Sequence, residues 1–200
     1  MERKYFTENV SKKSLLTLDE IVKVYQSLDD EEISVFPTKR RNKEHMEHKV
    51  CLRCDASNLG HWKHCGVNDC LDFITNLDCT MLGINVFGSN SYSGKHDINL
   101  TILNSSDVLR SMERVLYSEE GQNIYPVIFG KPLLVKKNIR YTIKLNMKGP
   151  NAFTGNSYKQ IVALNELSVT FLSSSVPSTN RTNETMGQIP GIIIQHIYKK

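Results

Sequence analysis

The residues best suited to chemistry are cysteines and histidines that gather within twenty positions of one another. Thiolate and imidazole groups are the ligands that tetrahedral zinc prefers. The spacing is irregular, however, because only one Cys-x-x-Cys pair occurs and two of the ligand types are adjacent. In a strand, residues three apart point to opposite faces, which would separate that pair. We therefore expect buried free cysteines, with no metal and no cofactor. The residues concerned are Cys51, Cys54, His61, His64, Cys65 and Cys70.

Nucleophilic catalysis would need a serine or cysteine beside a histidine and an orienting acid. Serines are plentiful, but no nucleophile-elbow glycine pattern surrounds any of them. No phosphate-binding loop, dinucleotide fingerprint or paired-histidine metal motif is present. We expect no catalytic residues and no enzymatic activity.

A basic run, Lys39-Arg40-Arg41-Asn42-Lys43, lies in a polar linker over residues 38–49. Such a run contacts phosphate in some proteins and is simply solvated in many others. The net charge of +4 is spread along the chain, so nucleic acid is not the expected partner. The second interpretation is a zinc-dependent nucleic-acid-binding module that uses Lys39–Lys43 and the Cys51–Cys70 region.

The stretch from Ile139 to Met147 alternates strictly between apolar and polar residues. A strand places such alternate residues on opposite faces, so this pattern predicts a strand with one face on a core and one in water. The same alternation recurs in several segments, and no helical pattern separates them. Short strands joined by turns predict an all-β fold, an antiparallel β-sandwich. Strands are expected near residues 71–75, 82–87, 98–102, 124–129, 139–147, 167–171 and 192–198, while 108–116 fits a strand or a helical turn.

The N-terminal segment, residues 1–37, contains one helical signal. Thr17-Leu18-Asp19-Glu20 has the form of a capping box. Leu18, Ile21, Val22 and Tyr25 then fall on one helical face, which predicts a helix over about residues 17–28. An odd number of cysteines, five, and a polar N-terminus without an apolar core favour the reducing cytoplasm. No apolar run reaches the length of a membrane-spanning helix.

Several motifs occur in an order that resembles the PHR domain family. Trp62, Gly66 and Asp69 lead into the apolar-x-Phe strand that ends at Phe73, and Gly83-Ile84-Asn85-Val86-Phe87-Gly88 follows. Further along are Tyr141-Thr142, Lys148-Gly149-Pro150 and Gly187-Gln188-Ile189-Pro190. The resemblance covers roughly residues 50–198. The preceding helical signal looks like the end of a BACK domain.

The resemblance implies a jelly-roll-like β-sandwich that binds protein. Family members occur in BTB-BACK-PHR proteins and in Pam/Highwire-type ubiquitin ligases, where the PHR domain is thought to receive a target for ubiquitination. It therefore implies the substrate-recognition part of a BTB-type cullin ubiquitin-ligase adaptor. These 200 residues contain no BTB sequence, so direct cullin binding by this segment is not expected.

Sandwich loops gather at the ends of the sheets and present a rigidly held surface. Three of them, 89–95, 149–158 and 173–186, are rich in glycine, asparagine, serine and tyrosine, which suits adaptable hydrogen bonding around aromatic anchors. The partner is expected to be a protein rather than a membrane. The predicted partner-binding residues are Tyr92, Ser93, Asn151, Phe153, Tyr158, Asn180 and Arg181.

Overall fold

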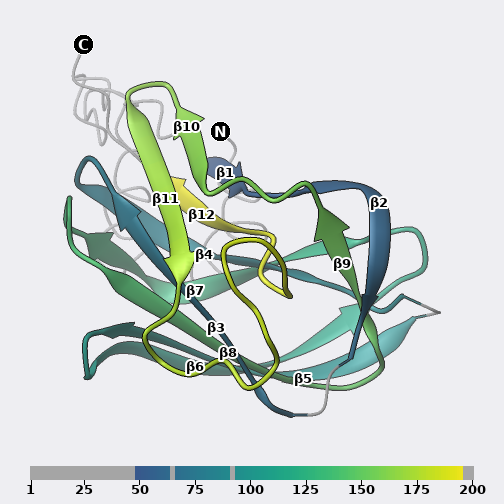
Figure 1. The fold of residues 1–200 in the computed structure, drawn as a ribbon. Helices are drawn as coiled ribbons and strands as arrows, with labels where there is room; N and C mark the ends of the chain where they lie inside the picture. The colour runs from purple at the N-terminus through teal and green to yellow at the C-terminus, as the bar shows by residue number, and fades with distance from the viewer. Residues whose placement is uncertain (1–47, 64–65, 91–92, 196–200) are drawn as a thin grey trace, which may run out of the picture. The chain divides into compact units, whose positions relative to one another are not determined.

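The computed structural model describes residues 48–63, 66–90 and 93–195 of the chain (Figure 1). The predicted helix over 17–28, the N-terminal segment and the basic run at Lys39–Lys43 lie outside these residues. So do His64, Cys65 and Tyr92. No helix within the described residues is long and apolar enough to cross a membrane.

Within the described ranges the regular structure consists of twelve strands, paired antiparallel throughout, which confirms the predicted all-β fold. The four-stranded sheet has the order β1 (His48–Leu52), β12 (Gly191–Gln195), β4 (Cys79–Phe87), β7 (Ile124–Val135). The six-stranded sheet has the order β10 (Ile161–Leu164), β11 (Leu167–Ser173), β3 (Asn68–Thr75), β8 (Tyr141–Lys148), β5 (Gly94–Asn104), β6 (Asp107–Ser118). A smaller sheet pairs β2 (Asp55–Trp62) with β9 (Ala152–Asn156).

The main core lies between the two larger sheets and is built by the alternation described above. On β8, Tyr141, Ile143, Leu145 and Met147 are all buried, as predicted. Burial of each such side chain stabilises the fold by roughly 1.5 to 3 kcal/mol. Ile139 is an exception at 39% exposed, because its backbone N–H still closes the preceding turn onto the carbonyl of Lys136. The strand therefore begins at Tyr141.

The undecided segment around residues 108–116 is a strand, β6, at the edge of the six-stranded sheet. It pairs with β5 from Gly94↔Ser118 to Asn104↔Asp107. Its pattern is mixed because an edge strand is partly wet on both faces. Val115 is 49% exposed, and Arg114, which lies opposite the buried Ile98, is exposed at the rim of the sandwich.

The β2–β9 pair covers a second, smaller core. Phe87, Cys54 and Ala152 are its buried members, with Phe153 and Tyr158 packed against them. The prediction of a loop over residues 149–158 is wrong for Ala152–Asn156, which form β9. Ala152 is fully buried and pairs with Trp62, so the segment is held in a sheet despite its glycine and asparagine content.

Candidate functional site

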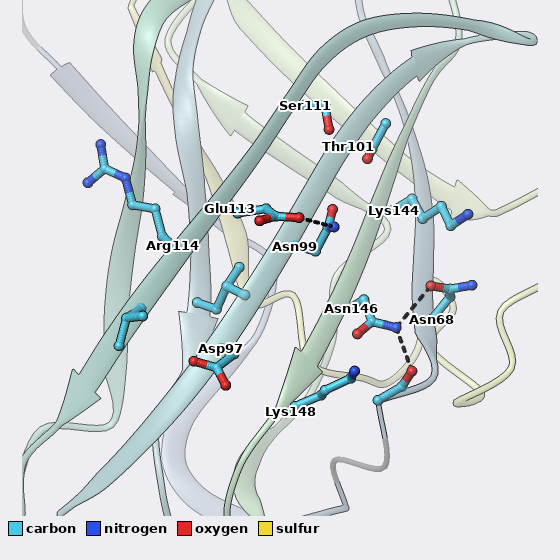
Figure 2. Close-up of a pocket in the computed structure, with 13 residues that line it drawn as sticks. Asn68, Asp97, Asn99, Thr101, Ser111, Glu113, Arg114, Lys144, Asn146 and Lys148 are labelled. Carbon is cyan, nitrogen blue, oxygen red and sulfur yellow. Dashed lines mark hydrogen bonds between the residues drawn. The ribbon is translucent and has the colours of Figure 1, made fainter.

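The outer face of the six-stranded sheet carries a polar groove with a volume of about 900 Å³. Figure 2 shows its side chains rising from β5, β6 and β8. Apart from Arg114, which lies opposite the buried Ile98 on the edge strand, each is an outward residue of a strand whose inward neighbours form the main core, so the same alternation creates both the core and the groove. The polar lining residues on these strands are Asp97, Asn99, Thr101, Ser111, Glu113, Arg114, Lys144, Asn146 and Lys148.

Strand register sorts the groove residues into rows that cross three strands. Asn99 lies opposite Asn146 on one side and Glu113 on the other, and its amide donates a hydrogen bond to the Glu113 carboxylate at 3.2 Å. The neighbouring row contains Lys144 and Thr101. Lysines therefore line the β8 side, whereas a carboxylate lies on the β6 side. Such a surface can bind polar and charged groups of both signs.

One end of the groove is tied to the segment before β3. The Asn146 side-chain amide donates hydrogen bonds to the Gly66 carbonyl at 2.5 Å and to the Asn68 side-chain oxygen at 3.3 Å (Figure 2). Gly66 has a φ of 68°, a left-handed conformation that glycine adopts without strain. The end wall of the groove is thus set by backbone geometry.

The loop between β11 and β12, residues 174–190, is held at its start by hydrogen bonds to a buried aspartate on β3. Asp72 is fully buried and lies 2.6 Å from the Arg140 guanidinium. Its carboxylate also accepts hydrogen bonds from the hydroxyls of Thr142 at 2.6 Å and Ser174 at 2.7 Å. The backbone N–H of Ser175 adds a fourth bond at 3.2 Å. A buried carboxylate satisfied in this way fixes the start of the loop.

A second β3 aspartate holds the middle of the same loop. Asp69 is fully buried and accepts hydrogen bonds from the Thr182 hydroxyl and, at 3.1 Å, from the Asn180 amide. Burial is the largest influence on this carboxyl and raises its pKa from 3.8 to about 6. The hydrogen bonds from Thr182 and Asn180 act in the opposite direction and favour the ionised form.

A buried arginine holds the end of the loop. The Arg53 guanidinium is fully buried and donates hydrogen bonds to the carbonyls of Ile189 at 2.7 Å, Asn183 at 2.9 Å and Met186 at 3.1 Å. Its cationic carbon lies 4.5 Å from the ring centre of Tyr158, a cation–π distance. Burial lowers the Arg53 pKa to about 10, so the group stays charged at neutral pH.

The clamped loop forms the rim at one end of the groove. The Asn68 carbonyl accepts hydrogen bonds from the Asn180 backbone N–H at 3.1 Å and from the Ser178 hydroxyl at 3.2 Å. The Asn68 N–H donates to the Thr179 hydroxyl at 2.9 Å. Since Asn68 lines the groove itself, the loop and the groove form one continuous, rigid surface.

The described residues among those predicted to bind a partner fall into two groups. Asn180 and Arg181 lie on the clamped loop beside the groove, where Arg181 is exposed. Asn151 is exposed and accepts a backbone hydrogen bond from Asn90 at 3.1 Å, which brings the 89–95 loop beside the start of β9. Ser93 is exposed in that loop. The assignment of these residues to partner binding stays a prediction.

Two of the predicted aromatic anchors have internal partners. Phe153 is half-buried in the second core. The Tyr158 hydroxyl donates to the Gly187 carbonyl at 2.7 Å and accepts from the Gly155 N–H at 3.2 Å, and its ring lies over Arg53. Tyr158 therefore stabilises the loops directly.

Sequence reasoning did not find the groove. Its residues come from strands far apart in the sequence, and each reads as an ordinary solvent-facing side chain. The available signal was the run of polar outward positions on β5 and β8, which the alternation predicted to be wet.

Three cysteines of the metal site considered above, Cys51, Cys54 and Cys70, are described, and they lie in different surroundings. Cys51 belongs to the main core and Cys54 to the second, while the Cys70 thiol donates to the Pro177 carbonyl at 3.7 Å. Burial raises the pKa of Cys51 to about 12 and those of Cys54 and Cys70 to about 11, which disfavours the thiolate form that binds zinc. No group of three potential ligands occurs among the residues that the structure describes.

The fold and site define an antiparallel β-sandwich with a polar outer groove and a clamped loop at its rim. The chain belongs to the PHR domain family, whose model matches residues 53–195. This confirms the resemblance drawn from the motifs.

The chain is also similar to named BTB/POZ proteins. It is 24% identical over 194 residues to human BTB/POZ domain-containing protein 6. The matched region covers 94% of this chain and 35% of that protein. It is 25% identical over 139 residues to human BTB/POZ domain-containing protein 3, covering 69% of this chain and 26% of that protein. The chain thus spans about a third of the length of these relatives or less.

Proposed function

We propose that this chain is a non-catalytic protein-interaction module that binds a target protein in the polar groove and against its clamped rim. The observation that carries the proposal is the continuity of the groove with a loop held by Asp69, Asp72 and Arg53. A loop whose backbone is already held in place loses little conformational entropy when it binds. The mixture of lysines, amides and carboxylates suits the polar surface of a protein.

The family supports a more specific role. Because the relatives are BTB/POZ domain-containing proteins, we propose that the chain resembles the target-recognition part of a BTB-type ubiquitin-ligase adaptor. Its target would then be a protein destined for ubiquitination. Nothing in the proposal requires this segment to contact a cullin.

We also propose that the module works in the cytoplasm. Four of its cysteines, Cys51, Cys54, Cys70 and Cys79, are free and buried, which supports a reducing compartment. Imaging of a fluorescent fusion tests this, and accumulation in the secretory pathway would contradict it.

The test of binding is affinity capture from a cytosolic extract with quantitative mass spectrometry. A variant carrying Lys144→Glu and Lys148→Glu reverses the charge of the β8 side of the groove. The matched control carries Lys131→Glu and Lys137→Glu, which make the same charge change on and just after β7. We expect a specific set of proteins to be lost only with the groove variant. Circular dichroism must show that both variants stay folded.

Equal capture by the groove variant and the wild type would refute the groove as the binding site. Equal loss with both variants would indicate a general charge effect instead. Capture that disappears on nuclease treatment would indicate that the partner is a nucleic acid and not a protein.

A further inference from the structure

The six-stranded sheet ends at β6, and the outer side of this strand is open. From Arg110 to Ser118 it pairs with β5 without a register shift, and no strand among the described residues pairs with its other side. An antiparallel edge strand directs half of its N–H and carbonyl groups away from its neighbour. Over Ser111–Tyr117, the backbone hydrogen bonds within the described part of the chain are those of the pairing with β5. The edge therefore offers a row of available donors and acceptors.

Side chains on both faces of this edge are accessible. On the outer face, Val115 is 49% exposed and Tyr117 is 70% exposed. On the inner face, Met112 and Leu116 pack against the main core but are only half-buried. A strand placed alongside β6 would bury more of all four side chains. The edge is thus incompletely covered in the chain by itself.

The other borders of the two large sheets are short or interrupted. β10 has 4 residues and β1 has 5, which leaves little edge to pair with. β7 is long, but it contains Pro126 and Pro132, and its pairing with β4 shifts between Met81 and Gly83. Proline supplies no N–H, and short strands, prolines and irregularities are the usual means by which edges avoid unwanted pairing.

An arginine of β6 protects β7 further. The Arg110 guanidinium donates hydrogen bonds to the carbonyls of Lys131 at 3.4 Å and Pro132 at 3.0 Å. These carbonyls of β7 are therefore already engaged. The 12-residue β6 contains no proline, glycine or lysine and has no such cover over Ser111–Tyr117 within the described residues. Among the four borders, β6 is the one suited to accept another strand.

Self-pairing of β6 would bring like charges together. In a two-fold antiparallel pair that continues the sheet, residues opposite each other lie on the same face. The two registers that overlap the strand most fully place Met112 or Glu113 opposite its own copy. The first register sets Arg110 against Arg114, and the second sets Glu113 against itself. Like charges directly opposite each other destabilise a pair, so charge complementarity favours a different chain as the occupant.

The outer face of β6 defines half of the chemistry of that chain. Glu113 lies opposite Asn99 of β5, on the same face as Val115 and Tyr117. A lysine or arginine placed beyond Glu113 would pair with its carboxylate. Valine and an aromatic residue placed beyond Val115 and Tyr117 would form favourable cross-strand apolar pairs.

The inner face defines the other half. Arg114 lies opposite the buried Ile98 and is exposed between the half-buried Met112 and Leu116. A carboxylate placed beyond Arg114, with an apolar residue on each side of it two positions away, complements this row. The matching segment therefore has an acidic and a basic residue next to each other, within an otherwise apolar extended sequence.

We propose that the free edge of β6, Ser111–Tyr117, pairs with an extended segment of a partner protein, which becomes a further strand of the sheet. The pairing is antiparallel, like every other pair in this fold, because that ladder is the more stable one. Backbone hydrogen bonds provide affinity, and the side-chain pairs select the sequence. The clamped loop borders the polar groove beside β3, whereas this edge lies at its other border. The site goes beyond the function proposed for the groove and does not depend on it.

The probe is a synthetic peptide with capped ends that places complementary residues opposite Tyr117 through Ser111. Its sequence is tyrosine, leucine, valine, glutamate, lysine, isoleucine and threonine, in that order. The full chain is titrated with the peptide, and amide hydrogen exchange is followed by NMR. We expect slower exchange at alternate amides of Ser111–Tyr117, because these N–H groups become hydrogen-bonded to the peptide.

Methylation of the peptide backbone tests whether a ladder forms. One peptide carries N-methyl groups at its odd positions and a second carries them at its even positions. In an antiparallel ladder only one of these two sets of N–H groups faces β6. One methylated peptide should therefore bind at least about tenfold more weakly than the other, since it loses those hydrogen bonds.

Charge exchange tests the predicted register. Glu113→Lys should weaken the peptide at least about fivefold, and a peptide with glutamate in place of its lysine should recover the loss. The matched control, Glu166→Lys, makes the same charge change in the turn between β10 and β11 and should leave binding unchanged. Circular dichroism checks that both variants remain folded.

Glu113 and Val115 also line the polar groove, so a further variant separates the two sites. Lys144→Glu with Lys148→Glu alters the groove on β8 and should leave the peptide bound. Loss of the peptide with this variant would place it in the groove and overturn the proposal.

Other results would also overturn it. Equal binding of the two methylated peptides would mean that no ladder forms, and slower exchange on β7 or β10 would place the site elsewhere. Absence of binding by the unmethylated peptide would leave β6 a solvated edge. Sedimentation that reveals a dimer with protected β6 amides would make a second copy the occupant.

Discussion

The two large sheets share a core but have opposite outer faces. The six-stranded sheet presents amides, lysines and carboxylates on β5, β6 and β8, whereas the four-stranded sheet presents Val50, Leu52, Ile128 and Leu134. The first face is stable in water as it stands. The second leaves apolar area in water that further cover would stabilise by roughly 25 cal/mol for each square ångström buried.

This difference shows that alternation identifies the inward face of a strand but does not determine whether the outward face is polar or apolar. On β8 the outward residues are polar, and the strand reads as a clean alternation. On β12 the run Gly191-Ile192-Ile193-Ile194 is apolar at every position, a pattern typical of a strand covered on both faces. The polar surface is additionally supported by buried ions, while aliphatic contacts dominate the apolar one.

The largest expected effect comes from removing Arg53, the buried ion that holds the loop at the rim of the polar groove. Arg53→Leu leaves the carbonyls of Ile189, Asn183 and Met186 without their donor, and we expect the free energy of unfolding to fall by about 3 to 5 kcal/mol. Urea denaturation measures it. The control Arg114→Leu removes an exposed arginine from β6 and should change stability by less than about 0.5 kcal/mol. Equal effects would contradict a specific role for Arg53.

The buried Asp69 makes the stability of the loop side of the molecule depend on pH. Its folded pKa of about 6 lies above the ordinary value of 3.8, so between these values the folded protein holds a proton that the unfolded chain releases. Its contribution to the free energy of unfolding therefore rises as the pH falls from about 7 towards 4, by up to about 3 kcal/mol.

The measurement is the difference in unfolding free energy between the wild type and Asp69→Asn at several pH values. Burial lowers the pKa of His96, which has the opposite pH dependence but is common to both proteins. A difference that stays flat from about pH 7 to about pH 4.5 would show that Asp69 titrates normally.

Adjacent residues on β7 test the apolar face directly. Val127 points into the main core and is 3% exposed, whereas Ile128 points outward and is 40% exposed. We expect Val127→Ser to cost about 2 to 3 kcal/mol and Ile128→Ser less than about 1 kcal/mol. Thermal unfolding of the pair is the measurement. A larger loss at Ile128 would place that face inside a core.

The smallest expected effect is on the groove wall. Glu113→Gln keeps the hydrogen bond from Asn99 but removes a charge, and stability should change by less than about 0.5 kcal/mol. The same urea titration detects it. A loss above about 1 kcal/mol would mean that this carboxylate holds the sheet together.

Alternation was sufficient to predict the sandwich and the strands that face the core. It did not find β1, β2, β9 or β10. For β2 and β9 the reason is that their register is irregular between Asp55 and Gly60 and neither strand alternates cleanly. It left β6 undecided because an edge strand has no fully dry face. Its periodicity signal is therefore weak.

The site was harder to predict than the fold. Charged residues such as Asp69 and Arg53 read as surface groups in a sequence, since isolated buried charges are costly. Their partners, among them Thr182 for Asp69 and Ile189 for Arg53, lie more than one hundred positions away. Only the folded chain brings them together.

The pairing of β1 with β12 has a consequence for synthesis. The first and last strands of the sandwich are neighbours, from His48↔Gln195 to Leu52↔Gly191, and β12 lies between β1 and β4. A nascent chain therefore leaves the edges of β1 and β4 open until Gly191–Gln195 emerge from the ribosome. Premature termination a few codons before residue 191 would remove a central strand and leave two exposed strand edges that invite aggregation.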